Sequence, residues 1–257
     1  MTSVTKFWPI LTAMHFYDKS ISTHNRGRGQ IIQAPILAYL IETKNGRILY
    51  DVGCDYNKIA DAKQRAKYYN AALGFNAPEM DESQRLPNQL ARMGLSIKDI
   101  DLIFISHLHF DHAGGLCDCG HAAVHIQAEE LANAKPKQDM AYFDNEISMQ
   151  ANWQLKTGEY DLAEGVRAIA SPGHTAGHMS LWIEMPTGAP IILAGDAADL
   201  TENIVDEVAP GNCWQDNTEL AIASIRKLKT LAHAEKASLW PNHDIAFWQK
   251  LNTTSNN

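Results

Sequence analysis

The sequence predicts a mixed α/β (α+β) fold in which sheets and helices pack in layers. Two observations lead to this class. Short apolar runs typical of buried strands recur along the chain, and segments of helical periodicity follow them, in the order strands, helices, strands, helices. The 257 residues suit one large domain or two small ones, and either arrangement supports a buried core.

The first expected strands form a hairpin. Residues 36–41 and 48–50 are apolar, and the Asn45-Gly46 dipeptide between them is typical of a tight turn. Later apolar runs have the length and composition of buried strands. These further strands are expected over residues 100–105, 122–126, 166–170, 179–184, 190–194 and 237–240.

Helices are expected over residues 84–93, 127–134 and 217–231. The first and last of these have apolar residues at helical spacing, which places them on one face, and 127–134 is expected as a short helix after a strand. Gly94 ends the first helix, and Asp216 or Asn217 can cap the start of the last.

Residues 135–158 have no clear periodicity and contain Tyr142, Phe143 and Trp153. Long irregular insertions in compact proteins often cover functional sites. This segment is therefore either a lid or a surface loop whose aromatic side chains pack on the core.

Composition excludes several classes of protein. The formal net charge is −8 and there is no long basic run, which argues against a nucleic-acid partner. No apolar run reaches the roughly 18 residues of a membrane span, and the N-terminus lacks the long apolar region of a signal peptide. We therefore expect no membrane partner and, by default, a cytoplasmic location.

The cysteines at positions 54, 117, 119 and 213 do not follow a disulfide or CxxC zinc pattern. Cys117 and Cys119 are too close in sequence for an easy bridge. With His121 they could form a thiol metal site, but free thiols in a loop are the simpler interpretation.

A cluster of metal-ligand residues follows the apolar run 100–105. His107, His109, Asp111 and His112 fall within one short segment, and imidazole and carboxylate groups suit zinc and similar divalent ions. If the segment is extended, alternation places the first three on one side. His112 would then face differently and could serve a second ion.

Three later residues extend this pattern. His174 follows the expected strand 166–170, Asp196 follows 190–194, and His243 follows 237–240. Each candidate ligand thus lies just past a buried strand, where a rigid site can be built. The repetition predicts a metal centre assembled from the ends of several strands.

The motifs HLHFDHAGG (107–115), PGHTAGH (172–178), GDAAD (195–199) and NHD (242–244) resemble, in order, those of the metallo-β-lactamase superfamily. The resemblance covers about residues 36–245. It implies a four-layer αββα sandwich that forms a single domain over residues 1–257. Residues 135–160 could be a lid insertion in that domain. The resemblance also implies two divalent metal ions. Zinc is the expectation from the ligand types.

The resemblance also implies a division of the ligands. His107, His109 and His174 would hold the first ion, Asp111, His112 and His243 the second, and Asp196 would bridge the two. His178 and Asp244 are candidates to support these ligands or to play a plain structural role.

Within the superfamily the chain looks most similar to the quorum-quenching N-acyl-homoserine lactone lactonases, through residues 48–54, 106–115, 224–229 and 243–244. This likeness implies a small-molecule lactone substrate and ring opening by a metal-bridging hydroxide. Asp111 would orient the hydroxide and pass its proton to the leaving group. A homodimer would also fit such lactonases.

One position departs from that family. Its members usually carry a tyrosine three residues after the bridging aspartate, and this chain has Asp199 there. The substrate contacts therefore stay open, with Asp199, Phe110, Tyr142, Phe143 and Trp153 as candidates. Phe16, Tyr17 and Trp214 could add to the apolar wall of a pocket.

Several alternatives follow from this departure. The chain could hydrolyse another small lactone or ester, such as a pyridoxolactone-like or γ-butyrolactone-like molecule. It could also be a glyoxalase-II-like thioesterase, although basic residues for glutathione are few. The alternative outside enzymes is a metal-dependent ligand-binding protein without turnover.

Overall fold

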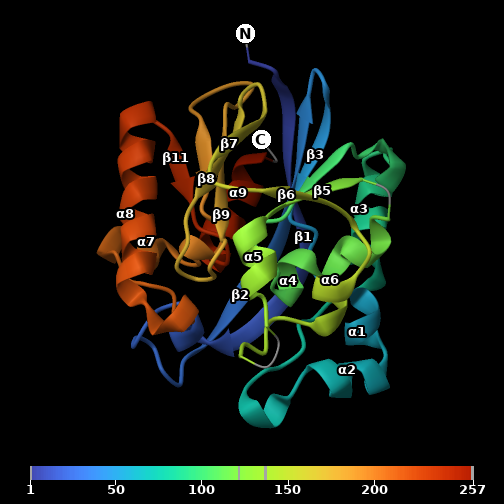
Figure 1. Cartoon of the computed structure of the whole chain (residues 1–257), viewed down its shortest axis with the longest axis vertical. Helices are drawn as coiled ribbons and strands as arrows, with labels where there is room; N and C mark the ends of the chain where they lie inside the picture. The colour runs from blue at the N-terminus through green and yellow to red at the C-terminus, as the bar shows by residue number, and fades with distance from the viewer. Residues whose placement is uncertain (1, 121, 136–137, 256–257) are drawn as a thin grey trace.

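The computed structural model describes residues 2–120, 122–135 and 138–255. Two β-sheets face each other at its centre, and helices cover their outer faces (Figure 1). In the described part of the chain, the first sheet has six strands in the order β1-β2-β3-β4-β5-β6. They are β1 (Val4–Asp18), β2 (Ile31–Thr43), β3 (Gly46–Tyr50), β4 (Leu102–Phe104), β5 (Ala123–Gln127) and β6 (Asn152–Lys156).

The second sheet has the strand order β11-β10-β9-β8-β7. Its strands are β7 (Tyr160–Ala163), β8 (Val166–Ala170), β9 (Met179–Ile183), β10 (Ile191–Leu193) and β11 (Ser238–Trp240). All the strands expected from the sequence lie within these two sheets. The predicted hairpin is also present, because β2 and β3 pair antiparallel and Thr43 lies opposite Gly46 at its turn.

Side-chain alternation in the first sheet separates two hydrophobic cores. Leu40 and Leu49 face outward, where they pack in one cluster with Leu90 of α3 (Leu86–Arg92). Their sequence neighbours Tyr39 and Tyr50 face inward and join a second cluster. That cluster fills the space between the sheets and includes Phe104, Val166, Leu181, Ile183, Ile191 and Leu193.

Helices complete the outer layers. The long helix α8 (Thr218–Glu235) covers the second sheet at the left of Figure 1, where Leu228 packs with Ile192 of β10. Helix α3 and α5 (Ala128–Asn133) cover the first sheet through Leu90 and Leu131. The layers are therefore helix, sheet, sheet, helix, and the predicted four-layer αββα sandwich is confirmed.

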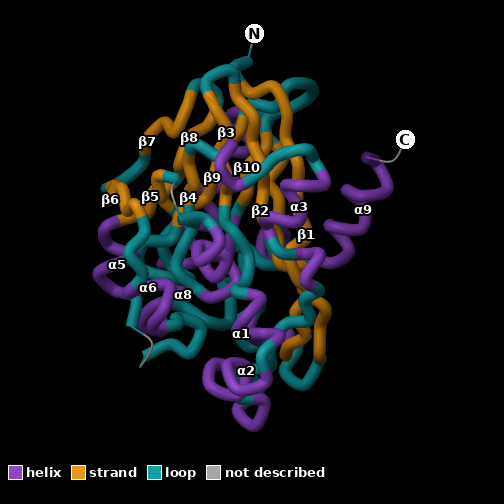
Figure 2. Tube along the Cα trace, turned by 90° about the vertical axis from the view of Figure 1, so that its right-hand side faces the viewer, coloured by secondary structure: helices purple, strands orange, loops and turns teal. Residues whose placement is uncertain are grey.

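The remaining helices connect or extend these layers. They are α1 (Tyr56–Ala60), α2 (Ala62–Tyr68), α4 (Phe110–Ala113), α6 (Asp144–Ser148), α7 (Thr201–Asp206) and α9 (Ile245–Ser255). Figure 2 shows α1 and α2 at the end of the molecule away from the N-terminus. None of the helices in the described part of the chain has the length and hydropathy of a membrane span.

The sequence analysis did not predict β1, β6, β7 or α9. Strand β1 mixes buried and exposed residues and shifts its register against β2 between Leu11 and Ala13, which obscures the alternation expected of a strand. The segment 135–158, expected to be irregular, contains α6 and the edge strand β6. Most of β6 is exposed, so it lacks the apolar pattern of a buried strand.

The sheet topology brings the sequence motifs together. Strands β10 and β11 are parallel, and both β8 and β10 run antiparallel to β9, so the carboxyl ends of β8, β10 and β11 share one edge. The loops after these strands carry residues 172–178, 195–199 and 242–244, and the loop after β4 carries 107–115. The fold thus delivers all four motifs to one end of the sandwich.

Replacing Phe104 tests the core between the sheets. Phe104 is buried and stacks on Tyr50 with ring centroids 5.7 Å apart. We expect Phe104→Ala to lower the free energy of unfolding by about 3–5 kcal/mol in urea titrations, because it leaves a cavity. Leu155→Ala on exposed β6 should change it by less than about 0.5 kcal/mol. Equal stabilities of the two variants would contradict this packing.

Candidate metal centre

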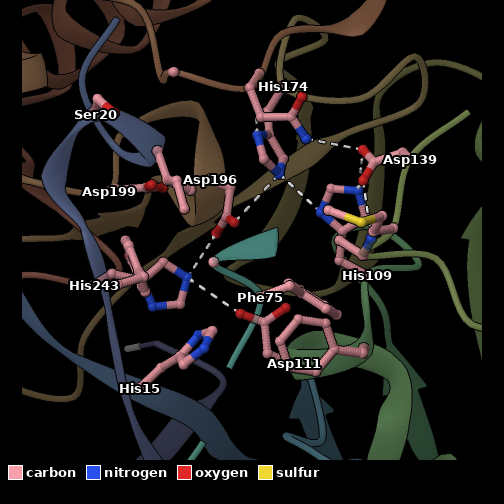
Figure 3. A pocket seen from close by; sticks show the side chains of 18 of the residues that line it. His15, Ser20, Phe75, His109, Asp111, Asp139, His174, Asp196, Asp199 and His243 are labelled. Carbon is pink, nitrogen blue, oxygen red and sulfur yellow. Dashed lines mark hydrogen bonds and ion pairs between the residues drawn. The ribbon is translucent and has the colours of Figure 1, made fainter. Parts of the chain in front are cut away.

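Seven predicted ligand side chains converge beside a pocket. Figure 3 labels five of them: His109, Asp111, His174, Asp196 and His243. The carboxylate of Asp196 lies in the middle. Its Oδ2 faces His107 Nε2 at 3.7 Å and His174 Nε2 at 3.4 Å. Its Oδ1 faces His112 Nε2 at 3.2 Å and His243 Nε2 at 3.3 Å. The two oxygens therefore point to two different groups of imidazoles.

These two groups match the division that the resemblance implied. The first contains His107, His109, His174 and Asp196, and the second contains Asp111, His112 and His243. Within each group one ligand atom per residue lies within 4.8 Å of every other. Each group could hold one divalent cation.

Every histidine of the centre has a hydrogen-bond partner on one ring nitrogen, so that the other nitrogen faces inward. The partners are the Ser106 hydroxyl for His107 (3.0 Å), Asp139 for His109 (3.1 Å), Asp51 for His112 (2.7 Å), and the backbone carbonyls of Asn212 for His174 (3.0 Å) and Pro35 for His243 (2.9 Å). A proton on the outer nitrogen leaves a lone pair on the inner one. Metal-binding histidines in proteins are held in this way.

Four of the five inward-facing nitrogens lack a donor within the protein, and the fifth, His243 Nε2, lies 3.2 Å from the side-chain amide nitrogen of Asn242. His107 Nε2 and His112 Nε2 are buried and make no hydrogen bond. His109 Nδ1 and His174 Nε2 face each other at 3.0 Å, and in the tautomers set by their outer partners both would present lone pairs. Buried polar atoms without partners are costly. Divalent cations would satisfy all four nitrogens, so the residues fit a metal centre.

The electrostatics of the centre also favour cations. Burial alone would raise the pKa of Asp196, but the imidazoles of His112 and His243 hold it well below its ordinary value. Burial lowers the pKa of His243, but the charge and hydrogen bond of Asp196, together with the charges of Asp199 and Asp111, outweigh this and raise it to about 10. At Asp199 two causes act in the same direction. Burial has the larger effect and the negative charge of Asp196 adds to it, and the pKa is raised to about 8. Negative charge is thus concentrated around Asp196.

Glu130 holds the two histidine loops in place. Its Oε1 accepts hydrogen bonds from the Leu108 amide (3.0 Å) and the Tyr142 hydroxyl (2.9 Å). Its Oε2 accepts from the Thr175 hydroxyl (2.7 Å) and the Gly177 amide (3.0 Å). A side chain at Gly177 would come within 2.4 Å of the Glu130 backbone, which explains this glycine. The carboxylate therefore links the loop after β4 to the loop after β8.

The two predicted supporting residues have different roles. His178 Nε2 accepts a hydrogen bond from the backbone amide of Asp196 (2.9 Å), so it positions the central carboxylate. Asp244 instead accepts hydrogen bonds from Thr201 (2.6 and 2.9 Å) and from the Phe247 amide (3.0 Å) at the start of α9. Its role is to anchor local structure.

Sequence reasoning missed three carboxylates, Asp51, Glu130 and Asp139. Asp51 follows β3 directly and adopts a positive φ of 55°, and it binds Ser106 as well as His112. Its position after a strand was a usable indication, because the predicted ligands share it. Glu130 lies in a short helix and Asp139 in an irregular segment, and nothing in their local sequence distinguishes them from surface acids.

A cavity of about 430 Å³ opens onto the centre (Figure 3). Phe110 and Asp199 line it, as do His15 and Tyr17 from β1. Phe75, whose ring lies 5.4 Å from that of Phe110, adds to the apolar part of the lining. Of the candidate substrate contacts, Phe110 and Asp199 therefore face the cavity.

The other aromatic candidates lie elsewhere. Phe143 and Trp153 pack in hydrophobic clusters and do not line the cavity. The ring of Tyr142 lies 4.5 Å from that of His109, but its hydroxyl is used by Glu130. Trp214 lines a neighbouring cavity of about 470 Å³ on the far side of His174. That residues 135–160 act as a lid stays a prediction, although residues 138–141 do line the first cavity.

The described structure offers no thiol site. The cysteines at 54, 117, 119 and 213 are free, and only Cys117 is exposed. The Cys119 thiol donates to the Gly115 carbonyl. His121, the third member of the alternative thiol site, lies outside the described residues.

The fold and the site define the class of protein. The family model of the metallo-beta-lactamase superfamily matches residues 32–237, and the chain belongs to that superfamily. The predicted resemblance is confirmed. The chain is 33% identical to an N-acyl homoserine lactonase of a Bacillus species, over 95% of this chain and 94% of that one. It is also 33% identical to N-acyl homoserine lactonase AiiA of Bacillus thuringiensis subsp. kurstaki, over 84% of each chain.

A solved structure agrees with these sequence relatives. It is an N-acyl homoserine lactone hydrolase with the product N-hexanoyl-L-homoserine bound at its catalytic metal centre. The present chain superposes on it with a TM-score of 0.87 and 31% identity over 97% of each chain. Within the superfamily, the chain therefore groups with the N-acyl homoserine lactonases.

Removing Glu130 tests how the histidine loops are held. We expect Glu130→Ala to lower the free energy of unfolding by about 3–5 kcal/mol in urea titrations, because four buried donors lose their acceptor. The neighbouring Glu129 is exposed on the same helix, and Glu129→Ala should change stability by less than about 0.5 kcal/mol. If both variants unfold at the same urea concentration, Glu130 does not hold the loops.

Proposed function

We propose that the protein opens the ring of N-acyl-homoserine lactones by metal-dependent hydrolysis. The observation that carries this proposal is the central carboxylate of Asp196, whose two oxygens face two separate groups of inward-pointing imidazoles. The identity to lactonases over most of the chain supports the choice of substrate.

We assign His107, His109 and His174 to the first metal ion and Asp111, His112 and His243 to the second, with Asp196 between them. Zinc is the proposed metal, because imidazole and carboxylate ligands suit it. When bound, such ions polarise a carbonyl oxygen and lower the pKa of water, which supplies a nucleophile at neutral pH.

The residues of the chain would bind the lactone and manage its proton. We assign Asp111, which lines the cavity, to take a proton from the attacking water and return it to the ring oxygen as the ester bond breaks. The product would be a single ring-opened hydroxy acid, because the ester oxygen belongs to the ring and stays attached to the molecule. Phe75 and Phe110 provide an apolar wall for the acyl chain and exclude water from one side.

Other features stay predictions. They are the cytoplasmic location, the homodimer and the closing of residues 135–160 over the site, each expected from the sequence. Another lactone or ester, or a thioester, would meet the same centre, and Asp199 is the residue that separates this chain from the usual lactonases.

Ring opening followed by pH-stat tests the proposal. The panel contains short- and long-chain N-acyl-homoserine lactones, γ-butyrolactone, pyridoxolactone and a glutathione thioester, each with the zinc-loaded protein. We expect acyl-homoserine lactones to open fastest and His109→Ala to lower kcat/KM at least ~100-fold, since it removes an inward-facing nitrogen. His24→Ala, at an exposed histidine away from the centre, should leave the rate unchanged.

Three results would overturn the proposal. Fast opening of a different lactone would name another substrate, and fast thioester cleavage would favour a glyoxalase-II-like enzyme. Calorimetric binding of a lactone without any ring opening would favour a ligand-binding protein. In each case the comparison of His109→Ala with His24→Ala shows whether the metal centre is involved.

A further inference from the structure

Asp199 is an unusual buried carboxylate at the edge of the metal centre. It follows β10, three residues after Asp196, and only 3% of its surface is exposed. It lines the cavity, and Figure 3 shows it beside Asp196. Its Oδ1 is buried and makes no hydrogen bond. A buried carboxylate oxygen without a donor is costly unless a proton or a cation satisfies it.

The position of Asp199 points to the second metal ion as that cation. Ligand atoms of Asp196, Asp199 and His243 all lie within 4.8 Å of one another. His243 also belongs to the second group, with Asp111 and His112. The unpartnered carboxylate is therefore next to His243 of the second position and next to the central Asp196, and it shares no such group with any histidine of the first position.

A buried hydroxyl group also acts on Asp199. Ser22 is fully buried, and its hydroxyl lowers the pKa of the Asp199 carboxyl against the larger opposing effect of burial. Tyr17 in turn bonds Ser22, with 2.9 Å between the two hydroxyl oxygens. Asp199 Oδ1 is left without a partner. The five histidines of the centre are likewise held from outside, through one ring nitrogen, with the other nitrogen turned toward the centre.

We infer that Asp199 is an additional ligand of the second metal position. The inference deepens the proposed function and rests on its assignment of two metal positions. The second position then has carboxylate oxygens from Asp111, Asp196 and Asp199 beside two imidazoles. The first keeps three imidazoles and one carboxylate, which makes the centre chemically asymmetric.

The asymmetry has a consequence for metal preference. Imidazole nitrogen favours zinc, whereas carboxylate oxygen suits harder ions such as Mn²⁺. The second position should therefore hold Mn²⁺ well once zinc occupies the first. Asp199 would supply the oxygen on which this preference depends, in a place where the usual lactonases have a phenol.

Manganese binding followed by electron paramagnetic resonance tests the inference. The full chain is stripped of metal, given one equivalent of Zn²⁺ and titrated with Mn²⁺, whose free-ion spectrum disappears on binding. We expect the native chain to bind one Mn²⁺, and Asp199→Asn to bind it about 10- to 100-fold more weakly. Asp244→Asn is the matched control, because this carboxylate directly follows the proposed ligand His243 but bonds Thr201, and the Mn²⁺ affinity of this variant should match that of the native chain.

Two further variants keep the test decisive. Asp199→Tyr restores the residue usual in lactonases, and it should bind two Zn²⁺ while losing the Mn²⁺ affinity. Ser22→Ala removes the hydroxyl beside Asp199, which also bonds Tyr17, and leaves the carboxylate in place. It should weaken Mn²⁺ binding by a smaller factor, and it serves if the Asp199 variants do not fold. Native Mn²⁺ affinity in Asp199→Asn, or in both other variants, would overturn the inference.

The outcomes for the inference and for the proposed function are separable. Loss of Mn²⁺ affinity in Asp199→Asn without any lactone opening by the native chain would leave the ligand assignment standing and remove the substrate. Lactone opening by the native chain, together with unchanged Mn²⁺ affinity in Asp199→Asn, would leave the proposed substrate standing and remove the ligand assignment. Metal content and spectra, measured without substrate, decide the first question.

Discussion

The carboxylate of Asp196 is the interaction on which the site depends. Each of its oxygens faces two histidine nitrogens, at distances between 3.2 and 3.7 Å, and these four histidines follow three strands, β4, β8 and β11. Such a cluster of buried imidazoles and carboxylates would be unfavourable if the side chains could rotate or if no cation balanced them. The rest of the structure prevents the rotation, and a metal pair would supply the charge.

Residues outside the ligand set keep the imidazoles from rotating. Asp51, Asp139 and three backbone or hydroxyl oxygens hold one nitrogen of each imidazole, and Glu130 ties the loops that carry them. The sandwich supplies these groups because its parallel and antiparallel strands end at a common edge. Packing between the sheets, centred on residues such as Phe104, thus fixes the positions of atoms that are far from it.

Much of this arrangement was accessible from the sequence, because local patterns encode it. The buried strands, the Asn45-Gly46 turn and the ligand motifs after four strands all depend on neighbouring residues. Glu130 and Asp139 were not accessible, since their roles depend on groups distant along the chain. The aromatic candidates were ambiguous for a similar reason: Phe110 lines the cavity while Phe143 stacks behind it, and composition alone does not distinguish the two.

The central claim is that two divalent ions are bound on either side of Asp196. Anomalous diffraction from crystals of the zinc-loaded protein, recorded at the zinc absorption edge, tests it most directly. We predict two peaks, one among His107, His109 and His174 and one among Asp111, His112 and His243. A single peak, or peaks away from Asp196, would contradict the claim.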